Sequence, residues 1–388
     1  MNVVFLSPHF PDHYHLFCQQ LKNLGATVLG IADAQYNQLP ENVRAALTEY
    51  YQVDDMHNYD ALVRALGYFT HRYGKIDRLD SLNEYWLETE ARLRDDFNIF
   101  GVRGDSIANI RQKSVMKEIF RAAGVLVAAG RVVATESDAL NFIAEVGYPV
   151  VAKPDAGVGA LNTFRLNNDA DLSAFFAAKP DVPYIIEAFV NGTIYSFDGL
   201  TDRDGAIVFH TGHTFSQGIM ETVNQGQHVS YYSLRNLPPQ LETHGRNCVT
   251  AFNVRERFFH IEFFETSPGN YVALEVNMRP PGGYTTDMFN YACDIDIYRI
   301  WAELLVTGHC LNPIERKYHC CYASRKNDHC YRHSHQDILA KYSPFIVQVV
   351  HVPGVFSSAL GDIGYIFRSP DIADIQAITT FIQETGEI

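Results

Sequence analysis

Residues 258–277, FFHIEFFETSPGNYVALEVN, contain two apolar runs that are rich in Phe, Ile, Val and Tyr and are separated by a Ser-Pro-Gly-Asn turn. Apolar runs of this composition, bounded by Pro and Gly, are typical of β-strands. We therefore predict an antiparallel hairpin with strands at 258–265 and 271–277 and a turn centred between Pro268 and Gly269.

This register places Glu262 opposite Glu275 and His260 opposite Asn277. Because side chains alternate between the two faces of a strand, these four polar residues share one face. The other face is apolar and pairs Ile261 with Val276 and Phe263 with Leu274. Two carboxylates that face each other destabilise a sheet unless a cation neutralises them. Mg²⁺, which prefers oxygen ligands and commonly binds one or two carboxylates together with phosphates, suits such a pair. A solvated hairpin face is the alternative.

The first 105 residues alternate strand-like and helical patterns. Apolar runs at 3–6 and 27–32 flank a helical pattern at 14–24, and a helix at 62–73 precedes a strand at 76–82. This alternation predicts a parallel sheet with helices on its faces. No Gly-x-Gly-x-x-Gly motif is present, so a dinucleotide site is not indicated.

From residue 107 the pattern changes to a mixture of helices and short strands. We predict a helix at 107–123, a second one capped by Thr135 or Ser137 and ended by Gly147, and a third at 169–178. Strands are expected around 148–153 and 183–191, and a hairpin turns at 202–205. The tail beyond 310 is expected to hold strands and turns and to end in a helix. At 388 residues the chain is long enough for two or three domains.

Composition excludes some classes of partner. A net charge of −14, with no block of like charges, argues against nucleic acid or an anionic membrane as the main partner. No run of 18 apolar residues and no signal-like N-terminus is present, so we expect a cytoplasmic protein. The seven cysteines favour reduced thiols. Residues 309–335 contain four cysteines and five histidines without a Cys-x-x-Cys pair, so an ordinary loop or strand surface is favoured over zinc.

Two lysines and one strand have the positions expected of a nucleotide site. Lys153 ends an apolar run and precedes a Gly-bearing loop whose backbone amides can approach phosphate oxygens. Lys113, forty residues upstream of Lys153, belongs to the helical segment predicted at 107–123. The run from Ile185 to Gly192 can present its backbone to a base edge. Taken singly, each feature is also explained by an exposed lysine or by a strand leaving the core.

Together these segments resemble the ATP-grasp superfamily, and ALEVNMRPPGG at 273–283 is the most specific element. The resemblance covers residues 1–310 and implies a multidomain α/β and α+β protein. We expect a Rossmann-like N-terminal domain at 1–105, a small ATP-grasp subdomain at 106–190 and a large subdomain with the metal hairpin at 191–310. A C-terminal extension that packs on the large subdomain is expected at 311–388.

The resemblance also implies residue roles and cofactors. Lys113 and Lys153 match the lysines that hold the phosphates of ATP, and Glu262, Glu275 and Asn277 match the ligands of two Mg²⁺ ions, or of Mn²⁺ in their place. The loop over the phosphates matches Ala156, Gly157, Val158, Gly159 and Ala160, and the adenine hinge matches Glu187, Ala188, Phe189 and Val190. Arg279 matches the arginine at the transferred phosphoryl group, so Arg279 and Lys153 are the expected catalytic residues. Ile194 stands where many relatives have a ribose-binding glutamate, so we expect Glu187 or Asp198 to take that contact.

The expected activity is that of an ATP-dependent carboxylate–amine ligase acting on small amino-acid-like substrates. Substrate contacts are expected from Arg279, Gly282 and Gly283. Glu84, His210, His213, Glu221 and His228 are further candidates, for which an ordinary surface position is the favoured alternative. The rivals are a carboxylase-type enzyme that activates bicarbonate, although no biotin-carrier-like Met-Lys-Met segment occurs, and a nucleotide-binding regulatory protein without turnover. The sequence leaves the oligomeric state open, and a homodimer is one possibility because dimers are the commonest soluble oligomers.

Overall fold

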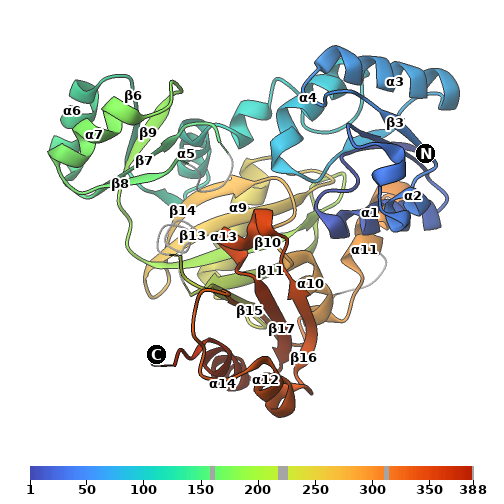
Figure 1. The fold of residues 1–388 in the computed structure, drawn as a ribbon. Coiled ribbons are helices and arrows are strands. Elements are labelled where there is room, and N and C mark those ends of the chain that lie inside the picture. The colour runs from blue at the N-terminus through green and yellow to red at the C-terminus, as the bar shows by residue number, and fades with distance from the viewer. Residues whose placement is uncertain (158–161, 217–225, 310–313, 387–388) are drawn as a thin grey trace.

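The computed structural model describes residues 1–157, 162–216, 226–309 and 314–386. Three sheets organise the chain (Figure 1): a parallel sheet in the N-terminal domain, a small antiparallel sheet, and a large sheet that runs through the centre and into the C-terminal part. The predicted multidomain α/β and α+β class is confirmed.

The N-terminal domain contains a parallel sheet of four strands in the order β3-β2-β1-β4. Its strands are β1 (Asn2–Leu6), β2 (Thr27–Ala32), β3 (Glu49–Gln52) and β4 (Arg78–Asp80), and its helices are α1 (His15–Asn23), α2 (Glu41–Ala46), α3 (Tyr59–Tyr73) and α4 (Leu87–Asp96). Alternate residues of β1 enter different hydrophobic clusters, Val3 and Phe5 on one face and Val4 and Leu6 on the other. Burial on both faces is what a parallel sheet flanked by helices requires.

The small antiparallel sheet, here called the lid sheet, has the strand order β6-β9-β7-β8. Its strands are β6 (Gly130–Val133), β7 (Val150–Pro154), β8 (Phe164–Leu166) and β9 (Tyr184–Ala188), and α6 (Glu136–Val146) and α7 (Asp169–Ala178) pack on one face (Figure 1). Helix α5 (Lys113–Ala122) and β5 (Leu126–Val127) precede it in the chain. The predicted cap of α6 is confirmed, because the Thr135 side chain accepts from the Asp138 N–H and the helix ends at Gly147 with φ 77°.

The large sheet has nine strands in the order β16-β17-β15-β12-β11-β10-β13-β14-β5. Its remaining strands are β10 (Thr193–Thr201), β11 (Ile207–Phe215), β12 (Ser230–Ser233), β13 (Phe258–Ser267), β14 (Asn270–Asn277), β15 (His319–Arg325), β16 (Ile346–His351) and β17 (Ile363–Ser369). The associated helices are α9 (Pro239–Ala251), α10 (Thr285–Cys293), α11 (Ile297–Thr307), α12 (His335–Tyr342), α13 (Gly354–Leu360) and α14 (Ile372–Gln383).

The C-terminal extension continues the large sheet edge to edge. β15 pairs with β12, and β17 and β16 follow outward, so the extension shares a hydrogen-bonded ladder with the large subdomain. The segment GVFSSAL, read from the sequence as strand and turn, is instead the helix α13. That interpretation was wrong because the run is too short for helical periodicity to stand out. Among the described residues, no helix combines the length and apolar character needed to cross a bilayer.

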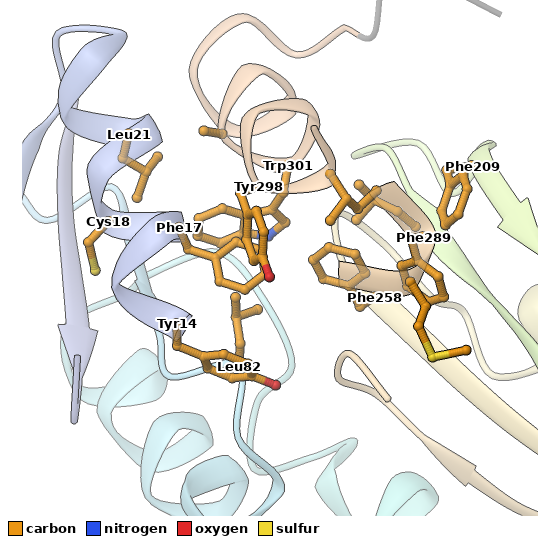
Figure 2. Close-up of a cluster of buried hydrophobic side chains, with 14 of the residues drawn as sticks. Tyr14, Phe17, Cys18, Leu21, Leu82, Phe209, Phe258, Phe289, Tyr298 and Trp301 are labelled. Carbon is orange, nitrogen blue, oxygen red and sulfur yellow. The ribbon is translucent and has the colours of Figure 1, made fainter. Parts of the chain in front are cut away.

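A buried aromatic cluster joins the N-terminal domain to the large subdomain. Figure 2 shows Phe17 of α1 among rings from two other parts of the chain. Its ring centroid lies 4.7 Å from Tyr298 and 5.2 Å from Trp301 of α11, and 5.8 Å from Phe258 of β13, all with near-perpendicular planes. Edge-to-face contacts add to the burial of apolar area. The two parts therefore share one continuous hydrophobic core.

Candidate functional site

The hairpin at the centre of the site has the predicted register over its key residues. In β13 and β14, His260 pairs with Asn277, Ile261 with Val276 and Glu262 with Glu275. The predicted partner of Phe263 was wrong, because Phe263 pairs with Ala273 and Leu274 is the extra residue of a β-bulge. The bulge lies directly beside Glu275, where it increases the local twist of the strand.

The polar face of this hairpin continues across two more strands. Residues directly opposite each other in antiparallel strands point to the same side. The following pairs extend the face: Ser196 with Glu262, Asp198 with His260, Ser196 with His213, and Asp198 with Thr211. The site therefore has a floor of polar side chains from β11, β10, β13 and β14.

Asp198 joins two histidines on this floor. It is completely buried, and its two carboxylate oxygens lie 2.5 Å from His260 Nδ1 and 2.7 Å from His213 Nδ1. Burial alone would lower the pKa of His260, but the Asp198 carboxylate outweighs it and raises that pKa to about 10. Nε2 of His260 faces Glu262 Oε1 at 3.4 Å. Because both oxygens of Asp198 are engaged beneath the surface, the expected contact of Asp198 with ribose does not fit; its role here is to orient the two histidines.

The predicted lysines lie close together beside the carboxylate pair. Lys113 Nζ is 3.7 Å from Glu275 Oε2, and Lys153 Nζ is 2.8 Å from Glu187 Oε2. Both lysines are buried, which excludes the alternative of exposed side chains. Burial alone would lower the pKa of Lys153, but Glu187, Glu275 and Glu262 together raise it, so Lys153 carries its positive charge.

Lys117 is a further buried lysine that the sequence reasoning missed. Its Nζ lies 2.8 Å from Glu187 Oε1, so Glu187 is held between Lys117 and Lys153. Burial would raise the pKa of Glu187, but these two ammonium groups lower it below its usual value. The available signal was spacing, because Lys117 lies four residues after Lys113 and thus on the same side of α5. With both oxygens paired, Glu187 is not free in this arrangement to contact a ribose.

Asp155 explains why α5 begins next to the end of β7. Its carboxylate accepts from the Ser114 N–H and from the Ser114 hydroxyl, each at 2.8 Å, and its carbonyl accepts from the Lys113 N–H at 2.8 Å. A carboxylate at a helix N-terminus satisfies unpaired amides and interacts favourably with the helix dipole. This junction brings Lys113 and Lys153 to the same side of the site.

Arg279 and Glu84 meet where the N-terminal domain contacts the hairpin. Glu84 Oε2 accepts from Nη2 and Nε of Arg279 at 2.8 and 3.1 Å, and Glu84 Oε1 accepts from Arg111 Nη1 at 3.1 Å. Gly282 and Gly283 form the turn after Arg279. The carbonyl of Gly282 accepts from the Thr285 hydroxyl, and Gly283 has φ 65°, a conformation that favours glycine.

The segment predicted to hold adenine lies at the end of β9, in the lid sheet. The backbone N–H groups of Ala188 and Phe189 donate to the carbonyls of Ala129 and Pro149. Among the described residues, the N–H of Val190 has no backbone acceptor, so it is the donor of this segment that remains for a base. Of the predicted phosphate loop, Ala156 and Gly157 follow β7, whereas Val158, Gly159 and Ala160 lie outside the described residues.

His210 and His213, which were each expected to contact substrate, do not share a face of the sheet. They are three residues apart on β11, so their side chains lie on opposite faces of the sheet. His213 belongs to the polar floor, whereas His210 lies on the α9 side, with Nε2 3.2 Å from Glu242 of that helix. His228 is partly buried, and its ring contacts those of Tyr331 and His329. Glu221 lies outside the described residues.

The cysteine- and histidine-rich segment does not form a metal centre in the described part of the chain. Cys320 and Cys321 are buried in β15, whereas Cys330 is exposed. Within the described ranges, no three His, Cys, Asp or Glu side chains are grouped so as to bind a metal by themselves. Cys310 lies outside the described residues.

The hairpin donors fit Mg²⁺ bound together with a phosphate. Glu262 and Glu275 are both about four-fifths buried, and the Asn277 side-chain amide donates to Glu275 Oε1 at 3.2 Å. Two carboxylates and one amide oxygen are too few to fill an octahedral shell, and Mg²⁺ usually completes it with water and substrate phosphates. Burial would raise the pKa of Glu275, but Lys113 and Lys153 lower it, so the carboxylate is ionised and ready to bind a cation.

The comparisons agree with this geometry. Residues 146–287 match the family model described as the ATP-grasp domain. An L-amino acid ligase from Bacillus licheniformis has a TM-score of 0.73 at 14% identity, covering 97% of this chain and 95% of that chain. An N5-carboxyaminoimidazole synthetase from Staphylococcus aureus has a TM-score of 0.69 at 15% identity, with coverages of 98% and 96%. A phosphoribosylglycinamide synthetase from Anaerococcus prevotii has a TM-score of 0.68 at 13% identity, with coverages of 100% and 99%. At such identities the similarity of these solved structures establishes the fold.

Proposed function

We propose that this chain, whose residues 146–287 match the ATP-grasp domain, is an ATP-dependent ligase that joins a substrate carboxylate to an amine. A carboxylate oxygen attacks the γ-phosphorus of ATP, the bond to ADP breaks, and an acyl-phosphate forms. The amine nitrogen then attacks the acyl carbon, phosphate leaves, and the nitrogen loses a proton. The products are an amide, ADP and phosphate.

The observation that carries this proposal is the convergence of charges around Glu275. Lys113 lies 3.7 Å from Glu275, and Lys153 is part of the same electrostatic group. Glu262 faces Glu275 across the hairpin. Phosphoryl transfer needs positioning and charge neutralisation more than covalent help from the protein. Helix α5, strand β7 and the β13–β14 hairpin are distant in sequence, yet together they supply positioning and charge neutralisation at one place.

We assign the following roles, which the positions of the side chains support. Lys113 and Lys153 bind the phosphates of ATP, and Glu262, Glu275 and Asn277 hold two Mg²⁺ ions, which neutralise the phosphate charge when bound. Arg279 points toward the N-terminal domain and binds the transferred phosphoryl group. The lid sheet, with Lys153 and the Val190 N–H, closes over the nucleotide and excludes water that would hydrolyse the acyl-phosphate.

Amino-acid-like substrates are favoured by the likeness to an L-amino acid ligase over nearly the whole of both chains. The second candidate is a carboxylase-type enzyme that activates bicarbonate, because structures titled N5-carboxyaminoimidazole synthetase and biotin carboxylase domain share the fold over a similar range. A regulatory protein without turnover would have no need of a second carboxylate, Glu262, opposite the Glu275 that contacts Lys113.

An assay of ADP and phosphate release separates these candidates. The ligase requires a carboxylate and an amine together, whereas the carboxylase requires bicarbonate. Glu275→Gln, which keeps the size of the side chain, should abolish release while leaving the circular dichroism spectrum unchanged. Release of ADP and phosphate that depends on bicarbonate alone would contradict the ligase and support the carboxylase. ATP binding without release across pairs of carboxylates and amines would contradict both enzymatic functions.

A further inference from the structure

A cavity of about 310 Å³ opens in the N-terminal domain, at the carboxyl ends of β1, β2 and β4. Ser7 follows β1, Asp33 follows β2, and Asn83 lies just beyond β4. In the sheet order β3-β2-β1-β4, the chain reverses direction across the sheet between β1 and β4. Open α/β sheets bind ligands in the crevice outside such a reversal. The cavity therefore lies where this architecture favours a binding site.

The backbone is strained on both sides of that crevice. Ser7 has φ 50° and Leu82 has φ 55°, although neither is a glycine. For a non-glycine residue, a left-handed conformation costs free energy and is often kept for function at a binding site. Ser7 lines the cavity, and Leu82 directs the following residue, Asn83, into its wall.

Three aromatic rings form one side of the cavity. The Tyr85 and Trp86 centroids are 4.8 Å apart, and His57 lies 5.8 Å from Tyr85 and 5.5 Å from Trp86. The Tyr85 side chain remains 55% exposed although its ring adjoins a cavity. A wall of this kind offers flat surface and ring faces to a planar or positively charged group.

Polar atoms on the other side are left without partners. Nδ1 of His9 is buried and has no hydrogen-bond partner within the described residues, and burial lowers the pKa of this ring, so it is neutral near pH 7. The Asp33 carboxylate also lines the cavity; it is exposed to solvent and lies close enough to His9 to act on the pKa of that ring. The Asn83 amide oxygen accepts from the Tyr85 N–H, which leaves the amide nitrogen as a donor. A buried polar atom without a partner is costly unless a ligand or water satisfies it.

The charge of the cavity selects an amine over a carboxylate. No lysine or arginine lines it, whereas Asp33 does. The residue after the cavity-lining Asn83 is Glu84, which binds Arg279 at 2.8 Å and so links the cavity wall to the arginine proposed for phosphoryl transfer. A substrate carboxylate would be repelled here, and a substrate with an amine or a ring N–H would be attracted.

We propose that this cavity binds the amine substrate of the ligase and that this amine carries a nitrogen-bearing aromatic ring, as histamine does. The ring stacks on the wall of Tyr85 and Trp86 and donates an N–H to Asp33. The amine nitrogen points past Asn83 toward Arg279. This assignment of a substrate class depends on the proposed ligase function, but the binding site itself does not.

Binding is tested without ATP by the fluorescence of Trp86. The chain has two tryptophans, and Trp301 is buried in the aromatic cluster, so a ligand in the cavity quenches Trp86 alone. Three primary amines that carry the same ammonium charge separate the ring N–H from the aromatic ring: histamine, 2-phenylethylamine and isopentylamine. We expect saturable quenching by histamine, binding about tenfold weaker for 2-phenylethylamine because it lacks the ring N–H, and the weakest binding for isopentylamine. Trp86→Phe is the control and should abolish the quenching signal.

Two exposed side chains provide variants that leave the core untouched. Asp33→Asn should weaken histamine about tenfold but change 2-phenylethylamine little, whereas Tyr85→Leu should weaken both ring amines. Circular dichroism and the melting temperature should stay those of the original chain. Absence of saturable quenching, or equal histamine affinity in Asp33→Asn, would overturn the site.

A release assay then separates this inference from the proposed function. With ATP, Mg²⁺ and a panel of carboxylates, histamine should stimulate ADP release with a KM that rises in Asp33→Asn while the KM for ATP is unchanged. If histamine quenches Trp86 but no carboxylate gives release, the site stands and the ligase function fails. If amines stimulate release equally in the original chain and in both variants, the ligase function stands and this site is wrong.

Discussion

Glu84 and Arg279, which are 195 positions apart in the chain, form a hydrogen-bonded ion pair with separations of 2.8 and 3.1 Å. The pair is largely buried, since its side chains are 8% and 18% exposed. Arg279 is therefore oriented by the N-terminal domain, although it belongs to the hairpin region. A side chain held in this way needs little reorganisation when negative charge develops nearby.

Replacing Glu84 should impair turnover more than nucleotide binding. In Glu84→Gln the guanidinium of Arg279 loses a charged partner worth about 1.5–3 kcal/mol, which corresponds to a fall of roughly tenfold or more in kcat. The KM for ATP should change less than about twofold. Glu88→Gln is the matched control, because Glu88 also contacts Arg111 but is 61% exposed. Steady-state kinetics check both variants, and equal kcat values would remove Glu84 from this role.

Asp198 should control metal affinity through His260. Asp198→Asn weakens the hold on His260, which faces Glu262 at 3.4 Å. Residues that orient a metal ligand typically change metal affinity by about 10–100-fold when replaced. We expect the Mn²⁺ dissociation constant, measured by electron paramagnetic resonance with ADP present, to rise at least about tenfold. Thr211→Val is the control, since the Thr211 hydroxyl on the same floor has no hydrogen-bond partner among the described residues; an unchanged constant in Asp198→Asn would contradict the prediction.

The buried charges between the N-terminal domain and the large subdomain should be essential for stability. Arg257 contacts Asp80 at 3.1 Å and Glu90 at 3.3 Å, and its Nε donates to the Met278 carbonyl at 2.6 Å. Removing one partner from a buried charge network costs about 3–5 kcal/mol. Arg257→Leu should therefore lower the free energy of unfolding in urea by about that amount. Arg131→Leu, which breaks an exposed pair with Glu145, should cost less than about 1 kcal/mol.

Glu187 should make the stability of the folded chain depend on pH. Lys153 and Lys117 depress its pKa, so the folded chain binds fewer protons at this group than the unfolded chain. The stability that ionised Glu187 contributes to the folded state is fully present above the ordinary glutamate pKa of about 4.3. It is lost as the pH falls through the lower pKa of Glu187 in the folded chain. Glu187→Gln should therefore be less stable at pH 7, with a difference that shrinks below about pH 4. Thermal unfolding from pH 7 to pH 3.5 measures this, and a constant difference would contradict it.

Sequence patterns predicted most helices and strands. They predicted contacts between residues only where those residues are close together in the sequence. The boundaries of β2 and α7 and the pairing of Glu262 with Glu275 follow from periodicity and turn residues over 20 residues or fewer. The same rule of alternation shows that His210 and His213 cannot share a face. Pairs such as Lys117 with Glu187 join segments whose meeting depends on the packing of the lid sheet on α5. A single sequence carries no signal for such long-range packing.

The aromatic cluster around Phe17 restricts how this protein can move. Rings from α1, α11 and β13 interlock at centroid distances below 6 Å, so separating the first domain from the large sheet would expose a dry core to solvent. Hinge motion at that junction is thus too costly to occur in each catalytic cycle. We therefore predict that nucleotide enters and leaves by displacement of the lid sheet, while the N-terminal part and the large sheet move as one body.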